Sequence, residues 1–389
     1  MNSKKINVAV VGCGMLAQAA HLPNIINNPR LHLRWCCDVN TETLKQAAEK
    51  FSPDKITTNP RDIASDKETH SVIICTHHNV RRDLIVLFAD AGKHIYAEKP
   101  MANNMDEVRD ICKAVKDSNV TFCIGHNRRC APAIKEARRV YLKHKANPVN
   151  PAWRWDREGL KGPNNDWAKR TLVLLRVNDD ALSWKKWCFE EGTLYGEMTH
   201  FVDLACYLTD LKPVAVTTIG DATTNFAINS INIEFEDHSL AIIATTNNGT
   251  FGYPKELVEI YYGGAAIVVD HCVELRVAGI INEPFWRTYP LDRDSLPYIH
   301  SDGGIQDYYR KTLALHQEVL EGKTTECIPP LPDKGWYQML EEFIDASLEG
   351  KPGPSDVIAS AVSTEVILKV VESANSGGKR VPINLDFIK

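Results

Sequence analysis

A short glycine-containing turn near the start of the chain restricts the possible folds more than any other sequence feature. Residues 7–11 read Asn-Val-Ala-Val-Val, which is typical of a strand buried on both faces, and Gly-Cys-Gly-Met-Leu-Ala follows at positions 12–17. In a strand-turn-helix unit of the G-x-G-x-x-A type, the glycines let the backbone approach a pyrophosphate, and the amides that open the helix bind it. The turn therefore predicts a dinucleotide-binding unit. Its predicted cofactor contacts are Gly12, Gly14, Met15 and Leu16.

An aspartate follows the next predicted strand. That strand covers Leu31 to Cys37, and Asp38 comes about twenty residues after the glycine turn, the spacing of a carboxylate that binds the adenosine ribose. Such a carboxylate accepts hydrogen bonds from the ribose hydroxyls and repels a 2′-phosphate, which favours NAD over NADP. Asp38 could instead cap the helix at Thr41 to Phe51, but Asn40 is also able to cap it. We therefore predict NAD as the cofactor, with Asp38 on its ribose.

Strands and helices alternate up to residue 126. Further strands are predicted at 55–57, 71–75, 94–96 and 120–124, with helices at 82–91 and 104–118. This alternation is typical of a doubly wound parallel sheet, so residues 1–126 are predicted to form a Rossmann domain.

The turn after the fourth strand should face the nicotinamide half of the cofactor through Thr76, His77 and Asn79. His77 and His78 are adjacent, so their side chains diverge, and no carboxylate or cysteine completes a ligand set at a recognisable spacing. No metal site is therefore predicted.

A charged motif follows the fifth predicted strand. Glu98-Lys99-Pro100 lies at the carboxyl end of that strand, where open α/β sheets bind their ligands. Proline fixes its own φ and permits a cis bond before it, which would hold Lys99 in one orientation. The triplet alone is also compatible with a charged loop that contains a helix breaker. In this place it predicts that Glu98 and Lys99 contact the cofactor.

The pattern changes after residue 126. Short β-rich segments with turn signals between them dominate residues 214–277, and helices are predicted on both sides of them. We therefore predict an α+β domain over residues 127–389 with an open, mostly antiparallel sheet. The predicted strands are 214–218, 230–235, 240–246, 257–262, 266–269 and 274–277, and the predicted helices are 132–144, 192–208, 305–320, 334–349 and 356–376.

Composition argues against several classes of protein. The net charge is −5 and no run of five or more basic residues occurs, so a nucleic-acid partner is not expected. No apolar stretch approaches the roughly 18 residues that suggest a membrane-spanning helix, so no membrane association is expected. The eleven cysteines are scattered without a C-x-x-C pair, which indicates a reducing compartment. We therefore predict a cytoplasmic protein.

Several landmarks follow one another in a recognisable order. They are the glycine turn, Asp38, residues 91–94 leading to Glu98-Lys99-Pro100, the Asn127-Arg128-Arg129 triplet and the segment Thr199 to Leu204. In their order and spacing the chain resembles the glucose-fructose oxidoreductase/inositol dehydrogenase (Gfo/Idh/MocA) family over nearly its whole length. The resemblance implies an NAD(P)-binding domain followed by a domain whose open sheet often makes the oligomer contact. It therefore predicts a homodimer or homotetramer that associates through the C-terminal sheet.

The same resemblance implies a chemistry. Members typically oxidise or reduce a hydroxyl carbon of a sugar or cyclitol; the lysine matching Lys99 touches both substrate and nicotinamide, and the histidine matching His200 is the usual general acid/base. Hydride transfer from a carbinol carbon requires the hydroxyl proton to leave, and a histidine suits that task near neutral pH. A helix histidine bonded to a backbone carbonyl is the alternative for His200. We expect Lys99 and His200 to act at one nicotinamide ring.

The chain departs from the family pattern at three places. Gly196 stands where many members carry an aspartate, one helical turn before the histidine. Glu197 shares the helix face of His200 and is the candidate replacement, although a solvated helix glutamate is the alternative. Thr76-His77 replaces a usual Thr-Pro, and Arg81 replaces a common histidine.

The sequence thus predicts an NAD-dependent dehydrogenase for a small carbohydrate or cyclitol. Trp184 could pack against the C–H face of a pyranose, with a core or interface position as the alternative. Two other functions stay open: a glycoside hydrolase that retains NAD and acts by transient oxidation and elimination, and a non-catalytic NAD-binding regulator. The predicted substrate contacts are Lys99, Asn127, Arg128, Trp184, Tyr195 and His200.

Overall fold

The chain forms two compact units in the computed structural model, which describes residues 5–146, 166–180, 193–220, 226–291, 303–325 and 330–386. The first unit contains the described residues up to Cys130 together with 335–365, and the second those between Ala131 and Lys334 together with 366–384. The predicted boundary after residue 126 differs from this division. Residues 335–365 pack with the first unit because Met339 and Phe343 of α11 (Trp336–Glu349) join its core cluster.

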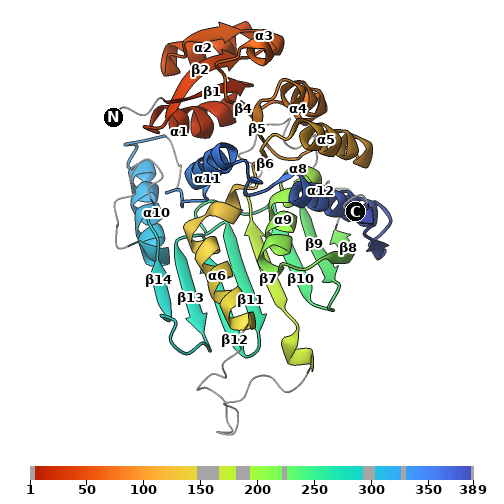
Figure 1. The fold of residues 1–389 in the computed structure, drawn as a ribbon. Coiled ribbons are helices and arrows are strands. Elements are labelled where there is room, and N and C mark those ends of the chain that lie inside the picture. Colours follow the sequence, from red (N-terminus) through yellow and green to blue (C-terminus); the bar gives the residue numbers. More distant parts are fainter. Residues whose placement is uncertain are drawn as a thin grey trace. The chain divides into compact units, whose positions relative to one another are not determined.

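The first unit contains a six-stranded sheet in the order β3-β2-β1-β4-β5-β6 (Figure 1). All five strand pairs are parallel, which confirms the predicted doubly wound fold. The strand order reverses between β1 and β4, so the loops that follow these two strands flank the switch point where such sheets bind ligands. The strands are β1 (Ile6–Val11), β2 (Leu31–Cys37), β3 (Lys55–Thr57), β4 (Ser71–Ile74), β5 (His94–Ala97) and β6 (Phe122–Ile124).

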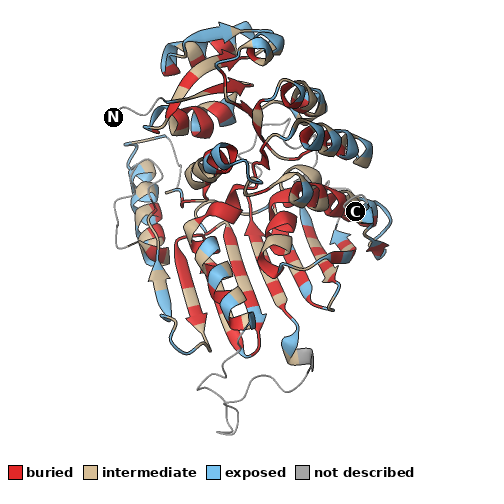
Figure 2. Ribbon diagram, in the orientation of Figure 1, coloured by how far each residue is buried: buried red, intermediate tan, exposed pale blue. Residues whose placement is uncertain are grey.

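Helices cover both faces of this sheet, and β1 shows why. Val8 and Val10 join one buried cluster, whereas Ala9 and Val11 join another, because alternate side chains of a strand point to opposite faces. Burial on both faces explains the continuous apolar runs, and Figure 2 shows it for the central strands. The helices are residues 15–26, which include a π-helical turn at Ala17–His21 and α1 (Leu22–Ile26), then α2 (Thr41–Phe51), α3 (Pro60–Ser65), α4 (Arg81–Asp90), α5 (Met105–Ser118) and α11.

The second unit contains a nine-stranded sheet in the order β14-β13-β12-β11-β7-β10-β9-β8-β15. Every pair is antiparallel except β7 with β10, which confirms the prediction of a mostly antiparallel sheet. The strands are β7 (Leu172–Asn178), β8 (Pro213–Gly220), β9 (Ile228–Phe235), β10 (Leu240–Thr246), β11 (Glu256–Tyr262), β12 (Ala265–Asp270), β13 (Glu274–Ala278), β14 (Trp286–Thr288) and β15 (Val381–Pro382).

Two helices, α6 (Pro132–Ala146) and α9 (Met198–Thr209), pack on the sheet of the second unit (Figure 1). The predicted single helix over 192–208 is interrupted within the described residues: α8 (Thr193–Gly196) ends at a glycine, and α9 starts after Glu197. The unit also contains α10 (Gly304–Leu320) and the last part of α12 (Val357–Asn375). None of the helices in the described ranges combines the length and hydrophobicity needed to cross a bilayer.

Candidate functional site

The glycine turn after β1 has the shape that a bound pyrophosphate requires. Gly12 has a φ of +87°, and a Cβ atom built on it would lie 2.7 Å from the carbonyl carbon of Cys75, so only glycine fits there. A Cβ atom on Gly14 would meet nothing within 4 Å, so the space beside this residue is open. Helical backbone begins at Met15, and the side chains of Met15 and Leu16 are exposed. The turn therefore fits the phosphates of a dinucleotide.

Asp38 is held against the glycine turn. Its Oδ2 accepts the Cys13 N–H at 2.7 Å, and its Oδ1 accepts the Asn40 N–H at 2.8 Å. The side chain of Asn40 caps α2 by accepting the N–H groups of Glu42 and Thr43, which excludes the capping alternative for Asp38. The carboxylate is thus fixed beside the turn at the carboxyl end of β2.

Arg81 connects the loops that follow β4 and β5. Its guanidinium is buried and donates to the carbonyl oxygens of Thr76 and Pro100, which a planar fork of five donors can reach together. The Thr76 hydroxyl oxygen is buried and has no hydrogen-bond partner among the described residues, so it is available to a ligand. His77 and Asn79 are exposed on the same loop. This loop therefore has the polar groups that a nicotinamide or its ribose could contact.

Glu98 and Lys99 lie at the carboxyl end of β5. The Glu98 N–H extends the strand ladder by donating to the Ile74 carbonyl at 2.9 Å, and the Glu98 side chain is buried. Lys99 is half-buried, and the Lys99–Pro100 bond is cis, the isomer that the sequence permits. The structure thus places the lysine at the same sheet edge as the glycine turn.

His21 is a residue of this edge that the sequence analysis missed. Its Nε2 lies 2.8 Å from Glu98 Oε1. Burial alone would lower the pKa of His21, but its contacts with Cys75 and Glu98 raise that pKa to about 10. Burial likewise opposes ionisation of Glu98, but His21, together with Lys99 and Arg81, lowers the pKa of its carboxyl group. Each partner therefore favours the charged form of the other.

His200 lies near the start of α9 in the second unit. It is buried, and its N–H donates to the Glu197 carbonyl at 3.2 Å. A Cβ atom built on Gly196 would meet nothing within 4 Å, so the backbone here leaves space for the first carbon of a side chain. Tyr195 is half-buried in α8. The structure thus brings Tyr195, Glu197 and His200 to one end of α9.

Glu197 belongs to a buried group of charges. Its Oε1 accepts a hydrogen bond from Lys255 Nζ at 2.9 Å, and the same ammonium lies 2.7 Å from Asp179 Oδ2. The side chain of Asp179 is fully buried and those of Lys255 and Glu197 are 12% exposed, which excludes a solvated glutamate. Burial raises the pKa of Asp179, Lys255 opposes this, and the charge of Glu197 adds to it. Glu197 is an anchored carboxylate, and its role toward His200 stays a prediction.

The other predicted substrate contacts do not all lie in the second unit. Asn127 and Arg128 are buried in a 3-10 turn, Asn127–Cys130, which belongs to the first unit rather than to the second. Trp184 lies outside the described residues. Within the described ranges, no cluster of three or more His, Cys, Asp or Glu side chains is placed to hold a metal ion.

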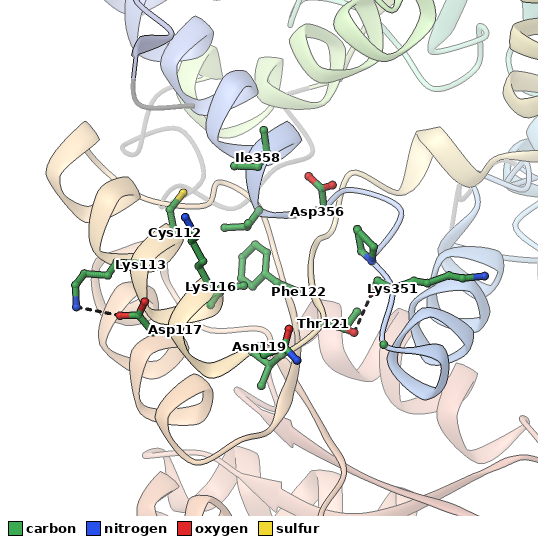
Figure 3. Close-up of a pocket in the computed structure, with 15 residues that line it drawn as sticks. Cys112, Lys113, Lys116, Asp117, Asn119, Thr121, Phe122, Lys351, Asp356 and Ile358 are labelled. Carbon is green, nitrogen blue, oxygen red and sulfur yellow. Dashed lines mark hydrogen bonds and ion pairs between the residues drawn. The ribbon is translucent and has the colours of Figure 1, made fainter. Parts of the chain in front are cut away.

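A cavity of about 690 Å³ lies elsewhere in the first unit (Figure 3). It opens beside Phe122, at the amino end of β6, with Lys116 and Lys351 among its lining residues. Because all six strands are parallel, this is the sheet edge opposite the glycine turn and Lys99. The cavity is therefore separate from the candidate cofactor site.

Comparison with known proteins identifies the first unit. The family model described as "Oxidoreductase family, NAD-binding Rossmann fold" (GFO_IDH_MocA) matches residues 6–126. Inositol 2-dehydrogenase from Rhizobium meliloti is 24% identical over 276 residues, which cover 68% of this chain and 76% of that protein. Over residues 6–126 the chain thus matches the NAD-binding domain of the Gfo/Idh/MocA oxidoreductase family.

Two further proteins that the chain is similar to differ in the activity that their names give. Levoglucosan dehydrogenase from Pseudarthrobacter phenanthrenivorans is 29% identical over 217 residues, which cover 53% of this chain and 51% of that protein. The 2,7-anhydro-N-acetylneuraminate hydratase of Escherichia coli is 24% identical over 282 residues, which cover 68% of each chain. A solved structure of levoglucosan dehydrogenase with NADH and levoglucosan matches with a TM-score of 0.71 at 21% identity, covering 98% of this chain and 100% of that one.

These matches confirm two predictions for this chain. The structural similarity confirms the fold of both units, and the family match makes the first unit an NAD-binding Rossmann domain. The turn at Gly12 and Gly14 and the buried Thr76 hydroxyl fit that cofactor on their own geometry.

Replacing Asp38 with alanine should weaken NAD binding and relax discrimination against NADP. The substitution removes the predicted acceptor of the ribose hydroxyls and the charge that repels a 2′-phosphate, so we expect the dissociation constant for NAD to rise about tenfold. Calorimetric titration with NAD and with NADP measures the ratio of their two dissociation constants. Asp54→Ala removes an equal charge from the exposed pair with His32 and should leave that ratio unchanged. A wild-type ratio in Asp38→Ala would refute the ribose assignment.

Proposed function

We propose that this protein is an NAD-dependent dehydrogenase that transfers a hydride between nicotinamide and a hydroxyl carbon of a sugar or cyclitol. One observation carries the proposal: Lys99 follows β5 at the sheet edge that holds the glycine turn and Asp38. In open α/β sheets this edge binds the ligand, so an ammonium there is available to a substrate beside the cofactor. The similarity to an inositol dehydrogenase and a levoglucosan dehydrogenase supports a polyhydroxylated substrate.

The chemistry assigns one task to each side chain. Bound NAD supplies the acceptor or donor of the hydride. Lys99 binds the reacting hydroxyl and stabilises the negative charge that develops on its oxygen. His200 accepts the hydroxyl proton as the carbonyl forms and returns it in the reverse direction. Glu197, held by Lys255, supplies the negative charge that favours the protonated imidazole in place of the aspartate absent at Gly196.

A substrate panel tests this function. The purified protein is mixed with NAD and each of a set of cyclitols and sugars, including myo-inositol and levoglucosan, and NADH is followed by its absorbance. We expect net NADH with at least one of these compounds, and NADH oxidation with the matching ketone. If every alcohol and every ketone is inert while NAD binds, the dehydrogenase assignment is rejected.

A second candidate uses NAD without consuming it. In this candidate, transient oxidation of the substrate makes a neighbouring C–H bond acidic and permits elimination. The similarity to a protein named as a hydratase is consistent with a reaction that does not consume NAD. Product release from a glycoside or anhydrosugar without net NADH identifies this activity. Bound NAD with neither product nor NADH would instead indicate the non-catalytic regulator.

We further propose a cytoplasmic homodimer or homotetramer that associates through the nine-stranded sheet. Alternate residues of the central strands, such as Leu174 and Ile242, are half-buried, whereas their neighbours Val173 and Ile243 are buried. This leaves partly exposed apolar side chains in neighbouring strands, as expected of an oligomer contact.

A further inference from the structure

A buried histidine–glutamate pair joins the helix after the glycine turn to the end of β5. His21 and Glu98 are 2% and 4% exposed, and His21 Nε2 lies 2.8 Å from Glu98 Oε1. His21 ends the π-helical turn Ala17–His21, and Glu98 directly precedes Lys99. The contact therefore connects the segment that binds the cofactor phosphates to the backbone that carries the lysine.

The Glu98 carboxylate is enclosed on its other sides as well. Its Oε2 accepts the Lys99 backbone N–H at 3.2 Å. A Cβ atom built on Gly125 would lie 2.8 Å from Oε1 and 3.0 Å from Oε2, so the glycine backbone lies directly against the carboxylate. The ring of His21 rests edge-on against Tyr96, with 5.2 Å between the centroids. Both members of the pair consequently have little freedom to turn.

We propose that His21 is a positioning residue: it holds the Glu98 carboxylate in the orientation that accepts the Lys99 N–H, and thereby fixes Lys99 at the sheet edge. This inference rests on the catalytic role proposed for Lys99. A buried carboxylate stays ionised only with a cation or strong donors beside it, and His21 provides the closest charge-assisted contact described for Glu98. Without His21 the carboxylate gains a proton or turns toward another donor, and the Lys99 backbone loses its acceptor.

A purely structural pair would behave differently. Such a pair would lower the melting temperature when broken but would leave kcat unchanged at temperatures where the variant is folded. A positioning pair also changes kcat, because a lysine displaced from its productive place stabilises the transition state less. Its two members should act as one unit, so their effects should not multiply.

The kinetic test uses His21→Gln, Glu98→Gln and the double variant, each assayed well below its melting temperature. We expect each single variant to lower kcat by about 10- to 100-fold, with a smaller change in the KM for the substrate. The double variant should lose no more than the worse single one, since two amides can re-form a neutral hydrogen bond. His32→Gln breaks an exposed histidine–aspartate contact of the same 2.8 Å length and should keep the wild-type kcat. Wild-type kcat in folded His21→Gln, or losses that multiply in the double variant, would overturn the proposal.

A second readout does not depend on turnover. In protein labelled with ¹³C at the histidine ring, the His21 signal, assigned by its loss in His21→Gln, should remain that of an imidazolium above pH 8 in the wild type. In Glu98→Gln it should titrate at lower pH, because Cys75, which also raises the pKa of His21, remains beside the ring but the carboxylate facing it has been removed. A neutral His21 at pH 7 in the wild type would reject the pair as proposed. If no sugar is turned over, this titration still decides whether the pair exists, so the two proposals can fail separately.

Discussion

Replacing Lys99 with alanine should lower kcat by about 10²- to 10⁴-fold while NAD binding survives. The lysine lies two residues after β5, on a backbone fixed by the hydrogen bond from the Glu98 N–H to Ile74 and by that from the Lys99 N–H to Glu98 Oε2. In the proposed mechanism the substitution removes the ammonium that would stabilise the developing alkoxide, whereas the glycine turn and Asp38, the proposed contacts of the dinucleotide, are unchanged. Stopped-flow measurement of the hydride step, with NAD affinity measured by calorimetry, separates the two effects.

Two matched variants sharpen this result. Lys99→Arg keeps the positive charge but cannot give up its proton, so it should recover part of kcat only if the lysine acts as a charge. Lys116→Ala removes an exposed lysine of α5 in the same unit, beside the cavity in Figure 3, and should leave kcat unchanged. Unchanged turnover in Lys99→Ala would reject the lysine's role and, with it, the proposed mechanism.

Local sequence signals account for most of the first unit. The second and third strands were predicted with the observed bounds of β2 and β3, because each is a short segment with apolar or β-branched residues that is bounded by turn residues. The helix break before α9 was not predicted, although Gly196 was a visible signal for it. Strand β7 was missed as well, since its apolar run stands apart from the β-rich residues 214–277 and its partners β10 and β11 are distant in sequence.

Local sequence signals could not predict the long-range contacts that hold the candidate site residues in place. His21 meets Glu98 across 77 positions of sequence, and the available signal was only a histidine inside an apolar helix. Lys255 meets Asp179 and Glu197 from a third segment, so the spacing of His200 and Glu197 could suggest their shared helix face but not the cation. Motif spacing therefore identified candidate side chains, whereas the buried charges that anchor them depend on the fold.

Replacing Lys255 with methionine should lower the free energy of unfolding by about 3–5 kcal/mol. Methionine keeps most of the side-chain volume but removes the cation between Asp179 and Glu197, so the fully buried Asp179 carboxylate loses its charged partner at 2.7 Å. Removing one member of a buried pair costs more than the pair contributes, because the remaining charge stays in a poorly solvated place. Urea unfolding at pH 7, followed by far-ultraviolet circular dichroism, measures the loss.

A second variant separates the two possible causes of the lower unfolding free energy, the unpaired buried charge and the loss of side-chain packing. Adding Asp179→Asn to Lys255→Met removes the stranded charge, so the double variant should be more stable than Lys255→Met alone. Lys113→Met breaks the exposed Lys113–Asp117 pair and should change the unfolding free energy by less than about 1 kcal/mol. If Lys255→Met also stays within that range, the buried group does not anchor Glu197. The carboxylate proposed to act on His200 would then need another support, whereas a large loss that Asp179→Asn relieves ties the start of α9 to the charge of Lys255.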